Sequence, residues 1–388
     1  MNDVAIVAAG QSKFGKRTDA GLRNLAFEAV KDLVEHADNI SLKEDIDATV
    51  IGVAGDEFNG QGAPAAVLID EIGMVGKPTI RVESACATGT AAIKTAYSLV
   101  KSGLHDTVLV VGVEKMTAVS TAKATELMAR AGDIRWEYPF GCTFPGFYAL
   151  MATKHMEEYG TTKEMLSSVS VKNHFYGAKN PKAHLRKEIT LEEAMNSIMI
   201  AHPLNLYDCS LISDGAAAVV VTKADLAKKY TDTPIYVRGI GSGSDTMQIS
   251  RRPSLTSLTG ARIAAQAAYK MAGVGPEDID LAEVHDCFTI AEIIAYEDLG
   301  FAKPGEGGKL ALEGQTYIGG KVAVNVDGGL KSKGHPLGAT GVSQAYEIFR
   351  QLRGEVASEG RQVDGAEIGL SHNVGQTGQF VNVIIYGR

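Results

Sequence analysis

Cys86 is the residue of this sequence best placed to act as a nucleophile. A predicted strand ends near Val82 and a predicted helix begins at Ala87, so the cysteine lies at the junction between them. Free backbone N–H groups and the positive end of a helix dipole stabilise a thiolate there, and we expect them to lower the pKa of the thiol. The neighbouring residues are small, which lets a bulky acyl group approach. The alternative is a buried structural cysteine, because most free cysteines pack as small apolar side chains.

A nucleophilic thiol needs a base and a site for the oxyanion that develops, and two histidine segments could supply them. His335 lies between glycines and beside a proline, in Gly-His-Pro-Leu-Gly, so its backbone is fixed and its imidazole can be aimed. An exposed loop histidine is the alternative there. His285, in His-Asp-Cys-Phe, follows a predicted strand over residues 281–284. Ligands of open α/β sheets bind at the carboxyl ends of the strands.

A zinc site is a competing interpretation of the His-Asp-Cys-Phe segment, since histidine and cysteine are both zinc ligands. The sequence has no Cys-x-x-Cys or His-x-x-x-His spacing, and only Cys142 and Cys209 remain to contribute. Structural zinc sites need four such ligands. We therefore expect no metal.

A fourth segment, Ser-His-Asn-Val-Gly-Gln-Thr-Gly over residues 371–378, separates two predicted strands at the end of the chain. Glycine allows the backbone N–H groups of such a turn to approach a substrate closely. We expect an oxyanion or substrate loop with His372, Asn373 and Gly375. The alternative is a plain tight turn with a surface histidine.

A basic run lies in the middle of this acidic chain. It contains Lys172, Lys179, Lys182, Arg186 and Lys187. Such a run is commonly a solvated surface, and the sharper interpretation is local attraction for an anionic substrate.

The composition excludes several classes of protein. The chain has 388 residues, a net charge of −8, 43 glycines, 4 cysteines and 45% hydrophobic residues. Disulfide scaffolds carry denser cysteine, disordered chains are less hydrophobic, and membrane spans need about 18 apolar residues in a row. The mild acidity disfavours nucleic-acid binding. Neither a dinucleotide fingerprint nor a Walker loop occurs.

The ends of the chain suggest where the protein acts. A predicted strand from Val4 leaves no room for an export signal. The last residues are not a peroxisomal signal. We expect a cytoplasmic protein.

Strand and helix signals alternate along the chain, which is typical of an α/β fold with both faces of its sheet covered. This rhythm breaks between residues 115 and 213, a stretch rich in Met, aromatic and Lys residues. We predict a first half over residues 1–114 and 214–228, an inserted loop subdomain over 115–213, and a second half over 229–388.

A short repeat suggests that the two halves are duplicates. Ala-Thr-Gly89 begins a predicted helix that ends near Gly103, and Ala-Thr-Gly341 begins one that ends near Gly354. The matched position in a repeated β-α order predicts duplication.

With these four segments in this order, the sequence resembles the thiolase superfamily over essentially its whole length. It is most similar to archaeal acetoacetyl-CoA thiolases and sterol-carrier-protein type thiolases, which share the His-Asp-Cys-Phe motif where most other thiolases carry Asn-Glu-Ala-Phe. The segments Lys172-Asn-His, Asn180-Pro and Cys209 to Ala218 also resemble that branch. The resemblance implies a duplicated, five-layered α-β-α-β-α fold with a loop subdomain that covers CoA.

The resemblance also implies roles for individual residues. Cys86 is acylated by the donor acyl-CoA, and His335 takes its proton. His285 and His335 form an oxyanion site for the second acyl-CoA. Backbone N–H groups near Cys86 and in the Gly375 turn hold the oxyanion of the acyl-enzyme.

One departure affects the second acid/base residue. Most thiolases place a cysteine in the fourth loop, where this chain has His372 and Asn373. In the His-Asp-Cys-Phe branch the cysteine of that motif serves instead, so the resemblance implies Cys287. His372 stays open as the alternative.

The expected activity is acetyl-CoA C-acetyltransferase, which joins two acetyl-CoA into acetoacetyl-CoA and CoA, or the reverse thiolysis. Alternatives are a thiolase for longer or branched 3-ketoacyl-CoA and a catalytically silent lipid-binding or scaffold member of the fold. A hydroxymethylglutaryl-CoA synthase is disfavoured by His285, and a thiolase-like aldolase by Cys86. A Cys-His protease would not explain the duplication.

The resemblance further implies that CoA thioesters are substrates and that no cofactor is needed. Lys172, Lys179, Lys182 and Arg186 are the candidate CoA contacts. The resemblance implies a homodimer or homotetramer. It also allows a complex with a small zinc-containing OB-fold protein and hydroxymethylglutaryl-CoA synthase, and it implies neither a nucleic-acid nor a membrane partner.

Overall fold

The computed structural model describes residues 3–388 and shows two halves with the same strand order. In the first half, neighbouring strands run β3-β2-β4-β7-β1, and in the second half they run β10-β9-β11-β12-β8. The first five are β1 (Val4–Gln11), β2 (Ala48–Gly52), β3 (Thr79–Val82), β4 (Thr107–Lys115) and β7 (Asp214–Lys223). The others are β8 (Ile235–Gly243), β9 (Leu281–Glu283), β10 (Ala323–Val324), β11 (Ile368–Gly375) and β12 (Phe380–Gly387).

The strand directions repeat as well. In each half the three strands of the β-α units are parallel, and the two remaining strands are antiparallel additions. The halves join at β1 and β8 through two residue pairs, Ala5 with Tyr236 and Ile6 with Ile235. The predicted duplication is therefore confirmed, and it covers the whole sheet rather than one shared motif.

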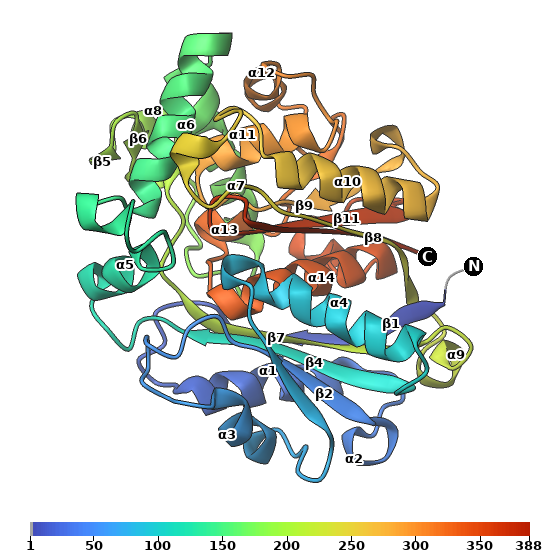
Figure 1. The fold of residues 1–388 in the computed structure, drawn as a ribbon. Coiled ribbons are helices and arrows are strands. Elements are labelled where there is room, and N and C mark those ends of the chain that lie inside the picture. Colours follow the sequence, from blue (N-terminus) through green and yellow to red (C-terminus); the bar gives the residue numbers. More distant parts are fainter. Residues whose placement is uncertain (1–2) are drawn as a thin grey trace.

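Helices and the two half-sheets form five layers (Figure 1). α4 (Thr88–Lys101) and α14 (Leu337–Arg353) lie between the half-sheets, and their apolar side chains share one core with strands of both. α1 (Leu22–His36) and α3 (Pro64–Glu71) cover the outer face of the first half. α10 (Thr259–Ala272) and α11 (Thr289–Asp298) cover that of the second. This is the predicted α-β-α-β-α arrangement.

The two central helices touch through the glycines of the Ala-Thr-Gly repeat. A Cβ atom on Gly89 would lie 2.7 Å from the backbone N of Gly341, and one on Gly341 would lie 2.2 Å from the backbone N of Thr90. Neither position has room for a side chain. The repeat therefore marks the place where α4 and α14 cross, with their N-termini side by side.

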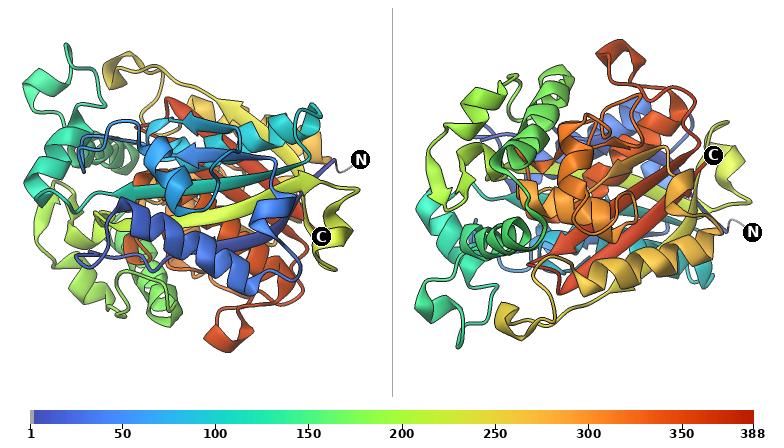
Figure 2. Two further views of the ribbon diagram at one scale, coloured as in Figure 1. Left: turned by 90° about the horizontal axis from the view of Figure 1, so that it is seen from below. Right: turned by 90° about the horizontal axis from the view of Figure 1, so that it is seen from above.

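Residues 115–213 leave the end of β4 and return into β7, and they form the helical lobe seen in green in Figure 2. The lobe contains α5 (Thr121–Ala129), α6 (Phe144–Tyr159), α7 (Lys163–Lys179), α8 (Leu191–Met195) and the ribbon of β5 (Met199–Ala201) and β6 (Leu204–Asn205). The remaining helices are short: α2 (Leu42–Asp45), α9 (Ala227–Tyr230), α12 (Gly307–Leu312) and α13 (Gly329–Ser332). Within residues 3–388, no helix is long and apolar enough to span a bilayer.

Candidate active site

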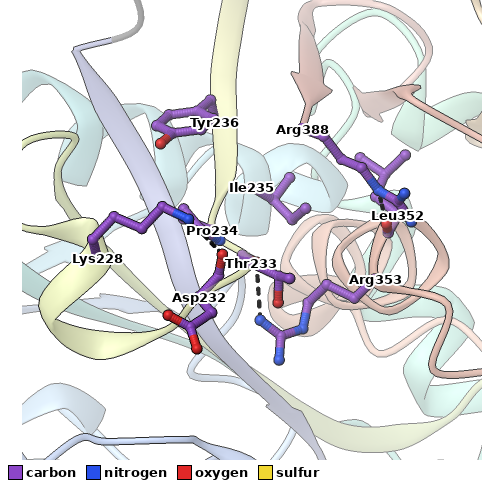
Figure 3. A pocket seen from close by; sticks show the side chains of 9 residues that line it. All are labelled: Lys228, Asp232, Thr233, Pro234, Ile235, Tyr236, Leu352, Arg353 and Arg388. Atoms are coloured by element: carbon purple, nitrogen blue, oxygen red, sulfur yellow. Dashed lines mark hydrogen bonds between the residues drawn. The ribbon is translucent and has the colours of Figure 1, made fainter.

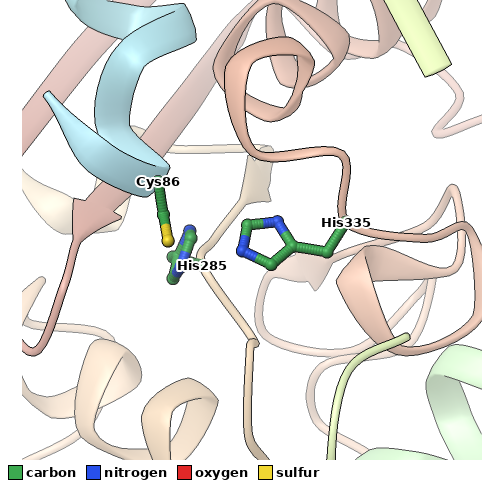
Figure 4. A group of neighbouring side chains, drawn as sticks. All are labelled: Cys86, His285 and His335. Atoms are coloured by element: carbon green, nitrogen blue, oxygen red, sulfur yellow. The ribbon is translucent and has the colours of Figure 1, made fainter. Parts of the chain in front are cut away.

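Cys86 lies in a single 3-10 turn, η1 (Ala85–Ala87), that connects β3 to α4. The turn is sharp: Ala85 has φ of 50°, in the left-handed region, and the hydroxyl of Thr88 accepts a hydrogen bond from Ser84 N at 2.9 Å. The thiol is thereby turned toward the second half of the molecule (Figure 4). Its sulfur and one ring nitrogen of each of His285 and His335 all lie within 4.8 Å of one another.

His335 is buried just before α14, three positions ahead of Gly338, the residue that the Ala-Thr-Gly repeat aligns with Cys86. Its Nδ1 lies 2.7 Å from the hydroxyl of Thr340, and that hydroxyl donates to the carbonyl of Pro336 at 2.9 Å. Because the hydroxyl proton is used on the carbonyl, the oxygen accepts from Nδ1–H of the ring. The other nitrogen, Nε2, then carries a lone pair and can act as a base.

His285 lies in the turn after β9, with its ring 5.0 Å from that of His335 at an interplanar angle of 80°. Asn373 Nδ2 is 3.1 Å from Nδ1 of His285 and donates to the carbonyl of Cys86 at 3.1 Å. Nε2 of His285 is buried and makes no hydrogen bond within the described chain. An unpaired polar atom in a buried position is costly unless a ligand completes it, so this nitrogen is available to a substrate.

Cys287 is buried two residues beyond His285 and lines the same cavity as Cys86. The hydroxyl of Tyr148, on α6, lies beside its thiol and donates to the carbonyl of Gln376 at 3.3 Å. The ring of Tyr148 stacks on Phe288 with centroids 4.6 Å apart. Sequence reasoning missed Tyr148, because nothing along the chain connects it with a motif more than 130 positions away.

The thiols are protonated in the free protein. Burial raises the pKa of Cys86 to about 12, against a smaller lowering by a hydrogen bond from the backbone of Gln376. Burial also raises the pKa of Cys287 above its ordinary value and lowers that of His335 to about 3. Our expectation of a lowered Cys86 pKa is wrong, because desolvation at the bottom of an apolar cavity outweighs the helix dipole. Near neutral pH a Cys86 thiolate is therefore disfavoured in the free protein.

Two buried carboxyl groups hold the loops in place. Asp286 accepts backbone N–H groups of Leu330 at 2.7 Å and Lys331 at 3.3 Å, which ties the His-Asp-Cys-Phe turn to α13. Glu114, at the end of β4, accepts from Ala54 N at 2.8 Å and Gly338 N at 3.0 Å. Burial raises the pKa of Asp286 to about 7 and that of Glu114 to about 8.

The fourth segment approaches Cys86 through its backbone. A Cβ atom on Gly375 would lie 2.4 Å from the carbonyl oxygen of Ser84, so the strand end and the Cys86 turn are in backbone contact. Asn373 points to Cys86, as described above. His372 is buried, lies outside both cavities at Cys86, and neither of its ring nitrogens has a partner within the described residues. It is not the surface histidine of the alternative prediction.

Two cavities meet at Cys86. One, of about 380 Å³, is mostly apolar and is lined by His285 and His335, by Cys287 and by residues of the inserted lobe. Those lobe residues are Met116, Thr121, Thr125, Met128, Phe144, Pro145, Ile200, Leu206, Cys209, Ser210, Leu211 and Ile212. The other cavity, of about 200 Å³, adjoins the first at Cys86 and includes Phe58, Leu127 and Arg130.

The four basic residues suggested for CoA are not among those that line either cavity. Lys172 is buried, is paired with Glu292 and donates to the carbonyl of Val324 at 2.8 Å. Lys182 is paired with Asp32 of α1.

Lys179 and Arg186 stay near the surface. The ammonium of Lys179 lies 3.9 Å from the centre of the Phe175 ring, and Arg186 is exposed. The positions of these side chains depend on burial and on ion pairs across the fold. A run of basic residues in the sequence reveals neither the burial nor the ion pairs.

A further hollow, of about 350 Å³, lies at the other end of the sheet, away from Cys86 (Figure 3). Its cationic side chains already donate hydrogen bonds to backbone carbonyl groups. Lys228 donates to the carbonyl of Asp232 at 2.6 Å, Arg353 to that of Thr233 at 2.9 Å, and Arg388 to that of Leu352. This hollow carries no reactive group.

Cys86, His285 and His335 also have the composition of a zinc site. A metal ion there would occupy the space between the thiol and the two rings, which is where a carbonyl attacked by Cys86 has to lie. The neutral thiol and the free His335 Nε2 fit proton transfer, so we treat the three side chains as reacting groups.

Comparison with known families matches both halves of the chain. Residues 4–225 match the family "Thiolase, N-terminal domain", and residues 241–388 match "Thiolase C-terminal domain-like".

Individual relatives agree with these matches. The acetyl-CoA acetyltransferase of Methanothermobacter thermautotrophicus is 46% identical over 389 residues, which cover 100% of both chains. Sterol carrier protein 2 of Bos taurus is 35% identical over 98% of this chain and 71% of its own. Among solved structures, the Ltp2-ChsH2(DUF35) aldolase has a TM-score of 0.86 and 26% identity, over 100% of this chain and 98% of that one.

Proposed function

The chain belongs to the thiolase family, and on this basis we propose that it is an acetyl-CoA C-acetyltransferase, which condenses two acetyl-CoA into acetoacetyl-CoA and CoA or catalyses the reverse thiolysis. The observation that carries the proposal is the convergence of Cys86, His285, Cys287 and His335 at one cavity. These residues come from two duplicated halves, and together they supply a nucleophile, a base, an oxyanion donor and a second thiol. CoA thioesters are the substrates, and the chemistry calls for no further cofactor.

The first half-reaction acetylates Cys86. His335 Nε2 takes the thiol proton while Sγ attacks the thioester carbon of acetyl-CoA, and backbone N–H groups near Cys86 and Gly375 hold the oxyanion. The bond to the CoA sulfur breaks, and Cys287 gives its proton to the departing CoA thiolate. The site then holds acetyl-Cys86, a Cys287 thiolate and a protonated His335.

The second half-reaction forms the carbon–carbon bond. The Cys287 thiolate removes a proton from C2 of a second acetyl-CoA, and the enolate oxygen lies between Nε2–H of His285 and Nε2–H of His335. The enolate carbon attacks the acetyl carbon, the bond to Cys86 breaks, and Cys86 recovers its proton from His335. All three groups return to their starting protonation states. Because CoA leaves the covalent acetyl-enzyme before the second acetyl-CoA reacts, we expect ping-pong kinetics.

The cavity of about 200 Å³ that adjoins Cys86 supports a second candidate, a thiolase for longer or branched 3-ketoacyl-CoA. An acetyl group does not need this space. Phe58 and Leu127 give its wall an apolar part that suits an alkyl chain, beside the charged side chains of Glu57, Glu83 and Arg130.

Assembly and location are also proposals. A homodimer or homotetramer in the cytoplasm fits the family, as does a complex with a small zinc-containing OB-fold protein and hydroxymethylglutaryl-CoA synthase. The similar Ltp2-ChsH2(DUF35) aldolase carries a second, DUF35 component in its name, which supports such an assembly.

The test uses the purified protein with acetoacetyl-CoA and CoA, and follows the loss of acetoacetyl-CoA absorbance. We expect turnover in the wild type and in Cys142→Ala, a matched loss of a thiol outside both cavities, and none in Cys86→Ala. Unchanged turnover in Cys86→Ala would end the assignment of the nucleophile. Loss in His372→Ala but not in Cys287→Ala would reverse the choice of second acid/base residue. A higher kcat/KM for 3-ketohexanoyl-CoA than for acetoacetyl-CoA would favour the second candidate.

A further inference from the structure

Asn373 is a buried side chain of β11 whose three hydrogen bonds use both ends of its amide. Its Nδ2 lies 3.1 Å from the carbonyl oxygen of Cys86 and 3.1 Å from Nδ1 of His285. Its Oδ1 accepts the hydroxyl of Thr90 at 3.0 Å. The side chain thus connects the nucleophile turn, the helix behind it and the oxyanion histidine, which belong to different segments of the chain.

These partners fix which way the amide faces. The carbonyl of Cys86 is only an acceptor, so the atom next to it must be the NH₂ group. The reverse orientation would place Oδ1 against the carbonyl oxygen. Amide orientation is decided by such partners, and here the Cys86 contact decides it.

The orientation determines where His285 carries its proton. Because the second N–H of Asn373 points at Nδ1, that nitrogen must accept and cannot hold a proton itself. A neutral imidazole has one ring proton, so it lies on Nε2. That atom is buried, has no hydrogen-bond partner among the described residues, and belongs to a ring that lines the cavity at Cys86.

The two histidines therefore carry their ring protons on different nitrogens: Nδ1 in His335 and Nε2 in His285. Thr340 accepts from Nδ1–H of His335 and leaves its Nε2 as a base. Asn373 donates to Nδ1 of His285 and leaves its Nε2–H as a donor. A donor at this position stabilises a developing enolate, whereas a lone pair there would repel it.

We propose that Asn373 is the positioning residue of the condensation step, because its amide holds the proton of His285 on Nε2. This inference rests on the proposed thiolase chemistry. Asn373 does not touch the reacting atoms; it acts through His285. The first half-reaction uses backbone donors for its oxyanion, so it depends less on this contact.

The test is the isosteric variant Asn373→Asp. Its carboxylate has no N–H, accepts Nδ1–H from His285 and moves the ring proton to Nδ1. We expect turnover to acetoacetyl-CoA to fall by about 10²–10³-fold, the size of the loss when one oxyanion donor is removed. Acetylation of Cys86 by acetyl-CoA, measured by mass spectrometry of the protein, should stay within about tenfold of the wild type.

A matched control is Thr90→Val, which keeps the shape and removes the hydrogen bond at the other end of the same amide. It leaves both N–H contacts in place, so turnover should change by less than about tenfold. A loss as large as that of Asn373→Asp would mean that the side chain matters only for packing, and the proposal would fail.

Nitrogen NMR of protein labelled with ¹⁵N-histidine reads the tautomer directly and does not require an active variant. The wild type should show His285 protonated at Nε2, with the signal assigned by its loss in His285→Gln, and Asn373→Asp should show it protonated at Nδ1. Protonation at Nδ1 in the wild type overturns the inference, even if the variant does not fold. So does an Asn373→Asp protein that loses acetylation together with turnover. Failure of the wild type to acetylate Cys86 would instead reject the proposed function.

Discussion

The two halves of the molecule share one architecture and divide the chemistry between them. In the first half, the central helix α4 starts after Cys86, the proposed nucleophile. In the second half, the equivalent helix α14 starts after His335, the proposed base. The turn after β9 adds His285 and Cys287, whereas in the turn after β2 the backbone N–H groups of residues 54 and 55 bind Glu114 and Phe58 lines a cavity wall. The two halves therefore share the arrangement of strands and central helices, and they differ in the side chains that their equivalent loops carry.

The two halves also differ in the connections that follow the equivalent strands β4 and β11. β11 leads through a tight turn straight into β12, and the backbone of Gln376 in this turn lies within hydrogen-bond reach of the Cys86 thiol. β4 leads into the lobe of residues 115–213 before the chain returns in β7. One half therefore meets Cys86 with a tight turn, and the other lines the cavity at Cys86 with apolar side chains of the lobe.

The largest effect we predict concerns the resting state of the nucleophile. Since the pKa of Cys86 is raised to about 12, its alkylation by iodoacetamide should follow the thiolate fraction. The rate should rise about tenfold per pH unit from pH 7 to 10, roughly a thousandfold in all, without a plateau. Peptide-resolved mass spectrometry measures it. A plateau below pH 9 would show that the first half carries a preformed thiolate and does not depend on His335 for its activation.

The next largest effect that we predict is a loss of stability when the contact between α4 and α14 is disturbed. In Gly341→Ala, the new methyl group would lie 2.2 Å from Thr90 N, so the backbones of α4 and α14 must separate. We expect the free energy of unfolding in urea to fall by about 1–3 kcal/mol, as for other overpacked cores, and turnover to fall with it. Gly146→Ala is the control, because this helical glycine of α6 has its nearest neighbour, Thr143 Oγ1, at 3.8 Å. Equal stability of the two variants would refute the contact.

The smallest effect that we predict is on KM for acetyl-CoA when two basic residues of the inserted lobe are replaced. Because Lys179 and Arg186 lie outside both cavities, the double replacement Lys179→Ala with Arg186→Ala should change KM for acetyl-CoA by less than about twofold. Steady-state kinetics at low ionic strength are the appropriate measurement, since screening is weakest there. A rise in KM of tenfold or more would contradict this prediction and would indicate that Lys179 and Arg186 contact CoA.

Features that depend on local sequence could be predicted. The strand-to-helix junctions at Cys86 and His335, the repeat and the position of the lobe follow from hydrophobic periodicity, small residues and glycine spacing. They predict which segments carry reactive groups. The family resemblance then brings the segments together, which no local pattern does.

Features that depend on pairing across the fold could not be predicted. Glu114 appears as one more residue at the end of a strand, and only the structure shows that its carboxyl group joins the turn after β2 to the start of α14. The burial of Lys172 depends on Glu292, 120 positions away. The sign of the Cys86 pKa shift depends on how deeply the thiol is enclosed, which the helix-dipole argument omits.

The crossing of Gly89 and Gly341 has a consequence for how the protein can vary. At this point the backbones of α4 and α14 are in contact, and the Thr90 hydroxyl and the Asn373 amide oxygen lie against Gly341. The two helices that follow Cys86 and His335 therefore leave no space at their crossing for a further carbon atom. Positions 89 and 341 cannot accept a larger residue unless the helices move apart.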